Sequence, residues 1–216
     1  MENLKKNLKV KNIIDSQSSN DFDVFANNYV SKLKGCFSKG INDKILNLSK
    51  SLLQVWEEGN NVFLCGNGGS AGNAIHIAND LIYGTGNCGN GEKTPGLKVT
   101  ALTANPAVLT CLGNDIGFEN IFSYQLKVKA NKNDILIALS GSGNSPNIFS
   151  AIKTANRIGL KTFGILAFSG GKCKDIVNYP IHFEINDMQI AEDLQLIIGH
   201  LCMQWLSNNK PKKFIP

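Results

Sequence analysis

Residues 134–158 read DILIALSGSGNSPNIFSAIKTANRI and contain a strand, a turn and a helix in succession. The run ILIALS is short, continuous and mostly apolar, which is typical of a strand buried on both faces of a parallel sheet. Serine and glycine make the turn, and Pro146 stands where a helix can begin, since the first helical residue needs no N–H. The stretch therefore predicts one unit of an α/β fold, in which a buried strand leads into a helix.

The same alternation of strand and helix extends over most of the chain. Short apolar segments bounded by turn residues predict strands at residues 61–65, 97–103, 134–140, 161–167 and 180–185. Apolar residues three and four apart predict helices at residues 70–83, 105–113, 118–130, 145–158, 170–177 and 188–207. Two more helices, 21–39 and 42–58, precede the first strand, and Asn42 or Asp43 is predicted to cap the second. This order predicts a doubly wound parallel sheet.

Composition sets the domain count and limits the partners. The chain has 216 residues, of which 43% are hydrophobic and 18% charged, so it can bury the core of one α/β domain. We expect that domain to span residues 21–207, between basic tails at residues 1–20 and 208–216. The net charge of +5 belongs to the ends, because residues 1–12 and 207–216 each carry three net positive charges. The rest of the chain is nearly neutral, so we expect no nucleic-acid partner.

Cysteine usage and hydropathy indicate the compartment. The six cysteines are scattered without a C-x-x-C pair, which indicates reduced thiols rather than disulfides or a cysteine zinc cluster. The first twelve residues are polar and lack the apolar segment of a secretory signal. The longest charge-poor stretch, residues 194–209, has too many polar side chains for a membrane span. We therefore expect a cytoplasmic protein with no membrane partner.

Two turns at the ends of predicted strands have the composition of phosphate sites. We call residues 65–72 (CGNGGSAG) the glycine loop and residues 140–147 (SGSGNSPN) the serine loop. Such turns lie at the ligand-binding edge of an open parallel sheet, where hydroxyls and the N–H groups of a helix start can bind an anion. Since Arg157 is the only arginine, these groups would replace guanidinium contacts. A plain tight turn is the alternative for each loop.

The glycine loop also matches the loose dinucleotide pattern G-x-G-x-x-A. That interpretation requires an acidic residue at the end of the second strand, where this chain has Leu102 and Thr103. We therefore expect no NAD cofactor.

Histidines and carboxylates on two helices are candidates for a metal site. His76 and Asp80 are four residues apart on the helix after the glycine loop, so they share one face. Such a pair can bind a metal or transfer protons, and a buried structural histidine is the alternative. The last helix carries Glu192 and His200, about 12 Å apart along its axis. They can converge on one ion only if the helix faces the site closely or a second subunit completes it.

Residues 84–96 (GTGNCGNGEKTPG) contain five glycines. This composition predicts a mobile surface loop, which is either a lid or a tolerated insertion.

Four stretches together resemble the phosphoheptose isomerases, members of the sugar isomerase (SIS) domain family. They are FLCGNGGSAGNAIHIANDL at residues 63–81, ALTANPAVLTCLGNDIGF at 101–118, ALSGSGNSPNIFSAIKTANRIGLKT at 138–162 and IAEDLQLIIGH at 190–200. The resemblance covers about residues 22–206. It implies a three-layer αβα sandwich with a five-stranded parallel sheet and a homotetramer whose active sites lie between subunits. The implied reaction is the zinc-dependent conversion of sedoheptulose 7-phosphate into glycero-manno-heptose 7-phosphate, which would feed heptose-containing polysaccharide biosynthesis.

The resemblance also implies site residues. The implied metal ligands are His76, Asp80, Glu192 and His200, with Asp80 and His200 as the catalytic pair. The implied substrate contacts include those first three ligands together with the loop residues Asn67, Gly68, Gly69, Ser70, Asn114, Asp115, Ser140, Gly141, Ser142 and Ser145.

Three positions depart from the family pattern. Asp80 replaces a glutamate, Glu192 replaces a glutamine, and Tyr83-Gly84 stands where the family commonly has Gly-Arg. Aspartate and glutamate oxygens are still competent ligands for a divalent cation. The alternatives to a heptose phosphate isomerase are an isomerase of another phosphosugar and a non-catalytic SIS module that binds a phosphosugar as a regulator or adaptor.

Overall fold

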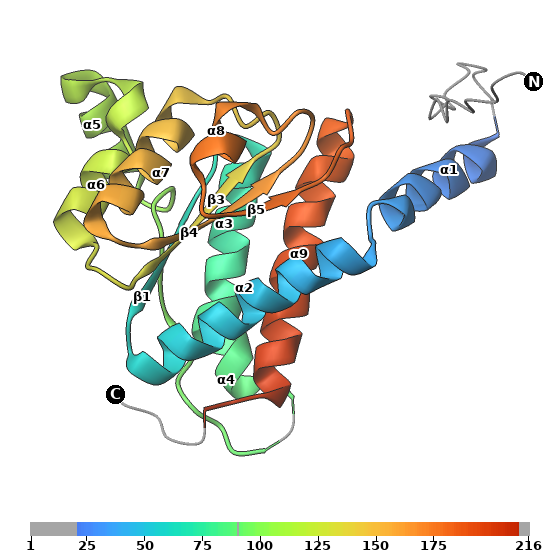
Figure 1. The fold of residues 1–216 in the computed structure, drawn as a ribbon, viewed down its shortest axis with the longest axis horizontal. Helices are drawn as coiled ribbons and strands as arrows, with labels where there is room; N and C mark the ends of the chain where they lie inside the picture. The colour runs from blue at the N-terminus through green and yellow to red at the C-terminus, as the bar shows by residue number, and fades with distance from the viewer. Residues whose placement is uncertain (1–20, 90, 212–216) are drawn as a thin grey trace, which may run out of the picture.

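The computed structural model describes residues 21–89 and 91–211. Its centre is a sheet of five parallel strands (Figure 1), which confirms the predicted fold class. The strands are β1 (Asn61–Cys65), β2 (Lys98–Ala101), β3 (Ile135–Ser140), β4 (Lys161–Leu166) and β5 (Tyr179–His182). All six residues of β3 are buried, as its continuous apolar run predicted. The spatial order is β2-β1-β3-β4-β5. The chain therefore adds β2 on one side of β1 and β3 on the other, which makes the gap between β1 and β3 the point where the strand order reverses. In an open parallel sheet this point favours ligand binding at the carboxyl ends.

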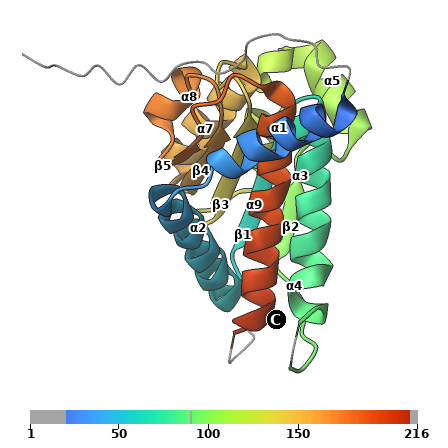
Figure 2. The same ribbon diagram turned by 90° about the vertical axis from the view of Figure 1, so that its right-hand side faces the viewer.

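Helices cover both faces of the sheet and complete the three-layer sandwich (Figures 1 and 2). One core packs the sheet against α2 (Lys39–Glu58), α3 (Gly69–Asn79) and α9 (Met188–Asn208). A second core packs the other face against α6 (Ser123–Lys129), α7 (Pro146–Ile158) and α8 (Gly171–Ile176). Two of the α-helices have no buried residue, α1 (Phe22–Gly35), which projects from the body in Figure 1, and α5 (Pro106–Ile116).

Several predicted boundaries are wrong, and three show how. Helix α2 begins before Asn42, because the Ser38 hydroxyl accepts a hydrogen bond from the Ile41 N–H and caps it. The helix predicted at 118–130 is broken into a 3-10 turn, η2 (Phe118–Asn120), and α6. Strand β5 ends at His182, three residues earlier than predicted.

Only the start of the glycine-rich segment 84–96 differs from the predicted surface loop, because the described residues from 88 to 96 have no helix or strand and are mostly exposed. A π-helical turn, η1 (Asp80–Gly84), and a short helix, α4 (Thr85–Asn87), continue α3, and Thr85 is fully buried. The carbonyl of Pro95 accepts a hydrogen bond from the indole of Trp56, near the end of the helix that leads into β1. The segment therefore packs at the amino ends of the strands, opposite the two loops, so it is not a lid over them in the same chain.

The predicted tails differ in how much of them is described. Residues 1–20 and 212–216 lie outside the described part of the chain. Asn208 still belongs to α9, and the Lys210 ammonium donates to the carbonyls of Gly86 and Glu92. Within residues 21–89 and 91–211, no helix is long and apolar enough to cross a membrane.

Candidate active site

The glycine loop connects the buried end of β1 to the start of α3, and α9 packs against it. The Gln195 amide donates to the Ser70 hydroxyl at 3.0 Å and accepts from Asn73 at 3.0 Å. The Glu192 carboxylate lies over Gly69, so close that a Cβ at that glycine would be 2.3 Å from its oxygen. The Ser70 hydroxyl, predicted to contact substrate, is therefore already bonded to α9.

Asn67 links the glycine loop to the serine loop. Its side-chain amide exchanges two hydrogen bonds with the amide of Asn147, at 2.9 and 2.8 Å. Asn147 is 1% exposed and also accepts a bond from the Ile148 N–H. The sequence analysis did not select Asn147 as a site residue. The signal that could have identified it is a polar side chain just after Pro146, at the start of a helix. The pair holds the two predicted phosphate sites in one arrangement.

The serine loop is held by its own hydroxyls. Ser140 accepts from the N–H of Gly143 at 3.1 Å, and Ser142 accepts from the N–H of Asn144 at 3.3 Å. Ser145 occupies the N-cap position of α7 without a side-chain capping bond, which leaves its hydroxyl available for a ligand. The loop therefore presents a hydroxyl and the N–H groups of a helix start at the carboxyl end of β3, as an anion site requires.

The predicted metal ligands converge in part. The Nε2 atoms of His76 and His200 are 2.9 Å apart, and each lies 3.5 Å from the Oδ2 atom of Asp80. These three side chains form the potential metal-binding group found among the described residues. The histidine side chains are 50% and 44% exposed and that of Asp80 is 17% exposed, so the group lies open on the surface of α3 and α9.

Close contact between α3 and α9 brings the histidines together. A Cβ at Gly199 would lie 2.5 Å from Cγ1 of Ile77, so only glycine allows this approach. Ile77 and Gly199 are the chain neighbours of His76 and His200. Asp80 begins the π-helical turn η1, a deviation that frequently accompanies functional sites.

The donor set fits a divalent transition metal. Two imidazole nitrogens and one carboxylate oxygen are typical ligands of a catalytic zinc, which keeps a fourth position open. Ligand atoms about 2.0–2.1 Å from a tetrahedral zinc lie about 3.3–3.5 Å from one another, close to the two distances to Asp80. The group could hold such an ion without large movement.

Glu192, the fourth residue of the predicted metal set, is not part of this group. Its carboxylate lies at the start of α3 beside Gly69, whereas His76 is seven residues, or about 10 Å, further along that helix. Within the single chain Glu192 does not join the other three ligands, so its role as a metal ligand stays a prediction that requires a second subunit to complete the site. The 12 Å between Glu192 and His200 along α9 is the physical reason.

Asn114 and Asp115 lie on the exposed helix α5. Asn114 donates to Asp115 at 2.8 Å, and the described side-chain bonds of both residues stay within that helix. The Cys111 thiol also donates to Asp115, which raises the pKa of that thiol. The predicted substrate role of this pair depends on what approaches α5.

The structure also indicates which groups are not nucleophiles. Burial and the neighbouring Cys173 raise the pKa of Cys65, the last residue of β1. Its thiol is therefore protonated at neutral pH, so the glycine loop carries no reactive thiolate.

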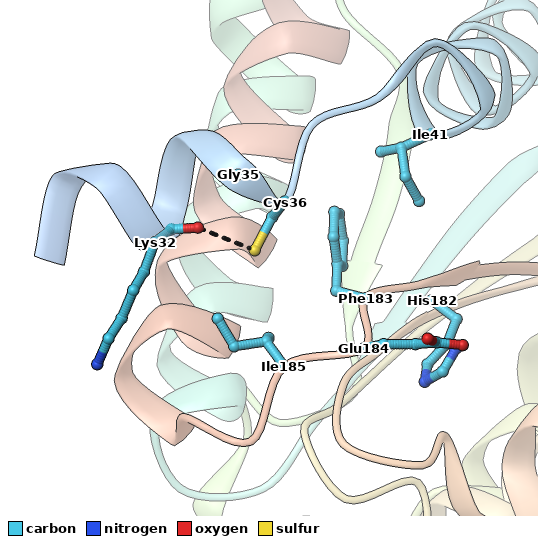
Figure 3. A pocket seen from close by; sticks show the side chains of 8 residues that line it. All are labelled: Lys32, Gly35, Cys36, Ile41, His182, Phe183, Glu184 and Ile185. Atoms are coloured by element: carbon cyan, nitrogen blue, oxygen red, sulfur yellow. Dashed lines mark hydrogen bonds between the residues drawn. The ribbon is translucent and has the colours of Figure 1, made fainter. Parts of the chain in front are cut away.

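A cavity of about 340 Å³, shown in Figure 3, is lined by no residue of either loop. It is located between the α1–α2 junction and the segment that follows β5. Its lining residues are Lys32, Gly35, Cys36, Ile41, His182, Phe183, Glu184 and Ile185. No predicted site residue belongs to this set.

Comparison with known proteins agrees with this geometry. The SIS domain family matches residues 25–167, which include both loops, His76 and Asp80. A phosphoheptose isomerase from Aliarcobacter butzleri is 36% identical over 160 residues, covering 74% of this chain and 82% of that protein. One from Clostridium acetobutylicum is 36% identical over 159 residues, covering 74% of this chain and 79% of that protein. The solved structure of a phosphoheptose isomerase from Francisella tularensis is 26% identical, with a TM-score of 0.76, and the match covers 88% of this chain and 97% of that one.

Proposed function

We propose that this chain, which belongs to the phosphoheptose isomerase family of SIS-domain proteins, is a metal-dependent aldose–ketose isomerase of a phosphorylated heptose. The observation that carries the proposal is the convergence of His76, Asp80 and His200 on one exposed surface, where the helix that starts at the glycine loop meets α9. The proposed substrate is sedoheptulose 7-phosphate and the product is glycero-manno-heptose 7-phosphate, in the cytoplasm. The product would enter heptose-containing polysaccharide biosynthesis.

The spacing of the site suits an extended phosphosugar. The serine loop would bind the phosphate, and the glycine loop, tied to it through Asn67 and Asn147, would lie beside the sugar chain. His76 is about 10 Å along α3 from Gly69, a distance that an extended sugar chain can span. Binding at the phosphate end would therefore position the carbonyl end at the His/Asp group.

The reaction requires two proton transfers. A base removes a proton from C1 of the ketose and returns it to C2, while another group moves a proton from O1 to O2. Asp80 has one oxygen, Oδ2, near both histidines, which leaves Oδ1 for the carbon-bound proton. His200 is the proposed carrier for the oxygen-bound proton. A zinc ion held by His76, Asp80 and His200 would polarise the sugar oxygens.

The proposal is tested by isomerase assays of Asp80→Asn and His200→Ala with sedoheptulose 7-phosphate. We expect kcat to fall about a hundredfold or more in each, the usual contribution of a general acid or base. Asp43→Asn, an exposed aspartate on α2, is the control and should retain full activity. Unchanged turnover in Asp80→Asn would remove Asp80 from the mechanism.

Metal removal separates an enzyme from a phosphosugar-binding regulator. Dialysis of the unaltered protein against a chelator should abolish isomerase activity, and added zinc should restore it. The variant His76→Ala should bind little metal because it lacks one of the three ligands. Elemental analysis of the purified protein measures the bound ion. A metal-free protein that still binds sugar phosphate would favour the regulator.

The proposed assembly is a homotetramer in which neighbouring copies complete the site. Helix α1 buries no residue, and Phe22, Phe25 and Val30 on it are at least 60% exposed. Tyr29 and Leu33 on another face of α1 pack against the core, so the exposed apolar residues are left for a partner surface. Ile75, Ile82 and Leu201 are also exposed around the His/Asp group. Apolar surface beside a polar site is typical of a subunit interface.

A further inference from the structure

Phe168, in the loop after β4, has an unusual backbone conformation. Its φ is +50°, and the other described non-glycine residue with a positive φ is Asn133, at +74°. Asparagine tolerates this left-handed region, whereas a bulky aromatic residue enters it only when the surroundings enforce it. Such strain is often found where a loop must keep one shape for function.

Two hydrogen bonds with residues 182–185, which are the end of β5 and the residues that follow it, enforce that conformation. The Phe168 N–H donates to the carbonyl of Ile185 at 3.0 Å, and its carbonyl is 2.9 Å from Nε2 of His182. A carbonyl only accepts, so Nε2 of His182 must carry the proton. The same segment, residues 182–185, forms one wall of the cavity in Figure 3. Ile185 and His182 therefore bond the N–H and the carbonyl of Phe168, one on each side of its Cα.

The loop that contains Phe168 packs directly on the serine loop. The Ala167 N–H donates to the carbonyl of Gly141 at 2.9 Å. The Phe168 ring comes within 3.7 Å of where a Cβ of Gly141 would lie. Gly143 has a φ of +66°, and a Cβ there would overlap the carbonyl oxygen of Gly170. Little room separates the serine loop from the loop after β4, so a change in one of these loops would displace the other.

We propose that Phe168 and His182 are positioning residues that hold the serine loop in the shape that binds the phosphate of the substrate. The proposal rests on the proposed phosphosugar function. The strained Phe168 places the Ala167 N–H and the aromatic ring against Gly141, and His182 prevents Phe168 from relaxing. Neither side chain needs to touch the reacting carbons.

The experiment measures binding of inorganic phosphate by calorimetry and steady-state kinetics with sedoheptulose 7-phosphate. Phe168→Gly accepts the backbone conformation but loses the ring, and His182→Phe keeps a ring but loses the donor. We expect both to weaken phosphate binding and raise KM about tenfold, the effect of losing roughly one hydrogen bond, with a smaller change in kcat. His182→Gln, which has a donor at a similar position, should restore most of the affinity.

Asn133→Gly is the matched control, because it changes the other described left-handed non-glycine residue, in the turn before β3 and away from the serine loop. It should bind phosphate like the unaltered protein, and thermal unfolding checks that all variants fold. If the unaltered protein binds phosphate and all four variants bind equally well, the positioning role is wrong and the proposed function stands. If the unaltered protein binds neither phosphate nor sugar phosphate, the proposed function itself fails.

Discussion

Gly199 marks a close contact between α9 and α3, directly beside His76 and His200. The absence of a side chain there lets α9 approach Ile77 of α3, and both histidines are adjacent in sequence to that contact. Helix propensity would favour alanine at this position, so the glycine is explained by packing rather than by local structure.

Gly199→Ala should therefore separate the two helices. The added Cβ would lie 2.5 Å from Ile77, and such overpacking costs about 1–3 kcal/mol. We expect a lower free energy of unfolding in urea and weaker zinc binding. Gly72→Ala is the control, since nothing lies within 4 Å of its Cβ position, and it should stabilise α3 by about 0.5–1 kcal/mol. Equal stability of the two variants would contradict this account of the contact.

At the scale of elements, α1 is attached to the body by Tyr29 and Leu33, which pack against the core, and by polar contacts with α9 and the residue before it. The Tyr29 hydroxyl donates to the Asp193 carboxylate at 2.5 Å, and Lys32 pairs with Asp187 at 3.6 Å. The hydrogen bond to Asp193 raises the pKa of Tyr29 from 10.0 to about 12, because the carboxylate favours the protonated phenol. The contact between α1 and α9 is therefore sensitive to alkaline pH.

The sign of that dependence follows from the raised pKa. The pKa of Tyr29 is higher in the folded chain than in the unfolded chain. The hydrogen bond between Tyr29 and Asp193 therefore contributes fully to stability below about pH 10, and this contribution is lost as the pH rises toward 12. We expect the difference in tyrosinate absorbance between the chain and Tyr29→Phe to titrate near pH 12. Asp193→Asn should return the midpoint toward 10. An unchanged midpoint in Asp193→Asn would show that another group holds Tyr29.

At the scale of the whole molecule, the exposed apolar surface of α1 predicts association between copies. Phe25 is 62% exposed, so Phe25→Asp would place a charge in the proposed interface. We expect this variant to shift from a tetramer to smaller species in light scattering and to lose activity. Val128→Asp is the control, because Val128 is 69% exposed on α6, on the opposite face of the sheet. A Phe25→Asp protein that keeps the mass of the unaltered chain would place the interface elsewhere.

The sequence predicted the fold well because its signals are local. Strand β3 and helix α7 follow from a buried apolar run, a serine turn and a helical repeat, each set by neighbours in the chain. Boundaries were less accurate where one hydrogen bond decides them, as with Ser38 at the start of α2. The helical, buried start of the segment 84–96 was missed because burial of Thr85 depends on distant partners, whereas the exposed remainder was predicted.

By itself, the sequence determined the parallel α/β sandwich, the two loops at its ligand-binding edge and the shared helical face of His76 and Asp80. The tertiary structure decided that His200 joins that pair within the single chain while Glu192 does not. The close contact at Gly199 brings the turn of α9 that carries His200 to His76, whereas Glu192 lies beside Gly69. The tertiary structure also decided that Asn147 ties the two loops together and that Phe168 is held in a left-handed conformation. Periodicity follows from the geometry of a few consecutive residues, whereas these contacts join residues that are distant in sequence and are fixed by close packing.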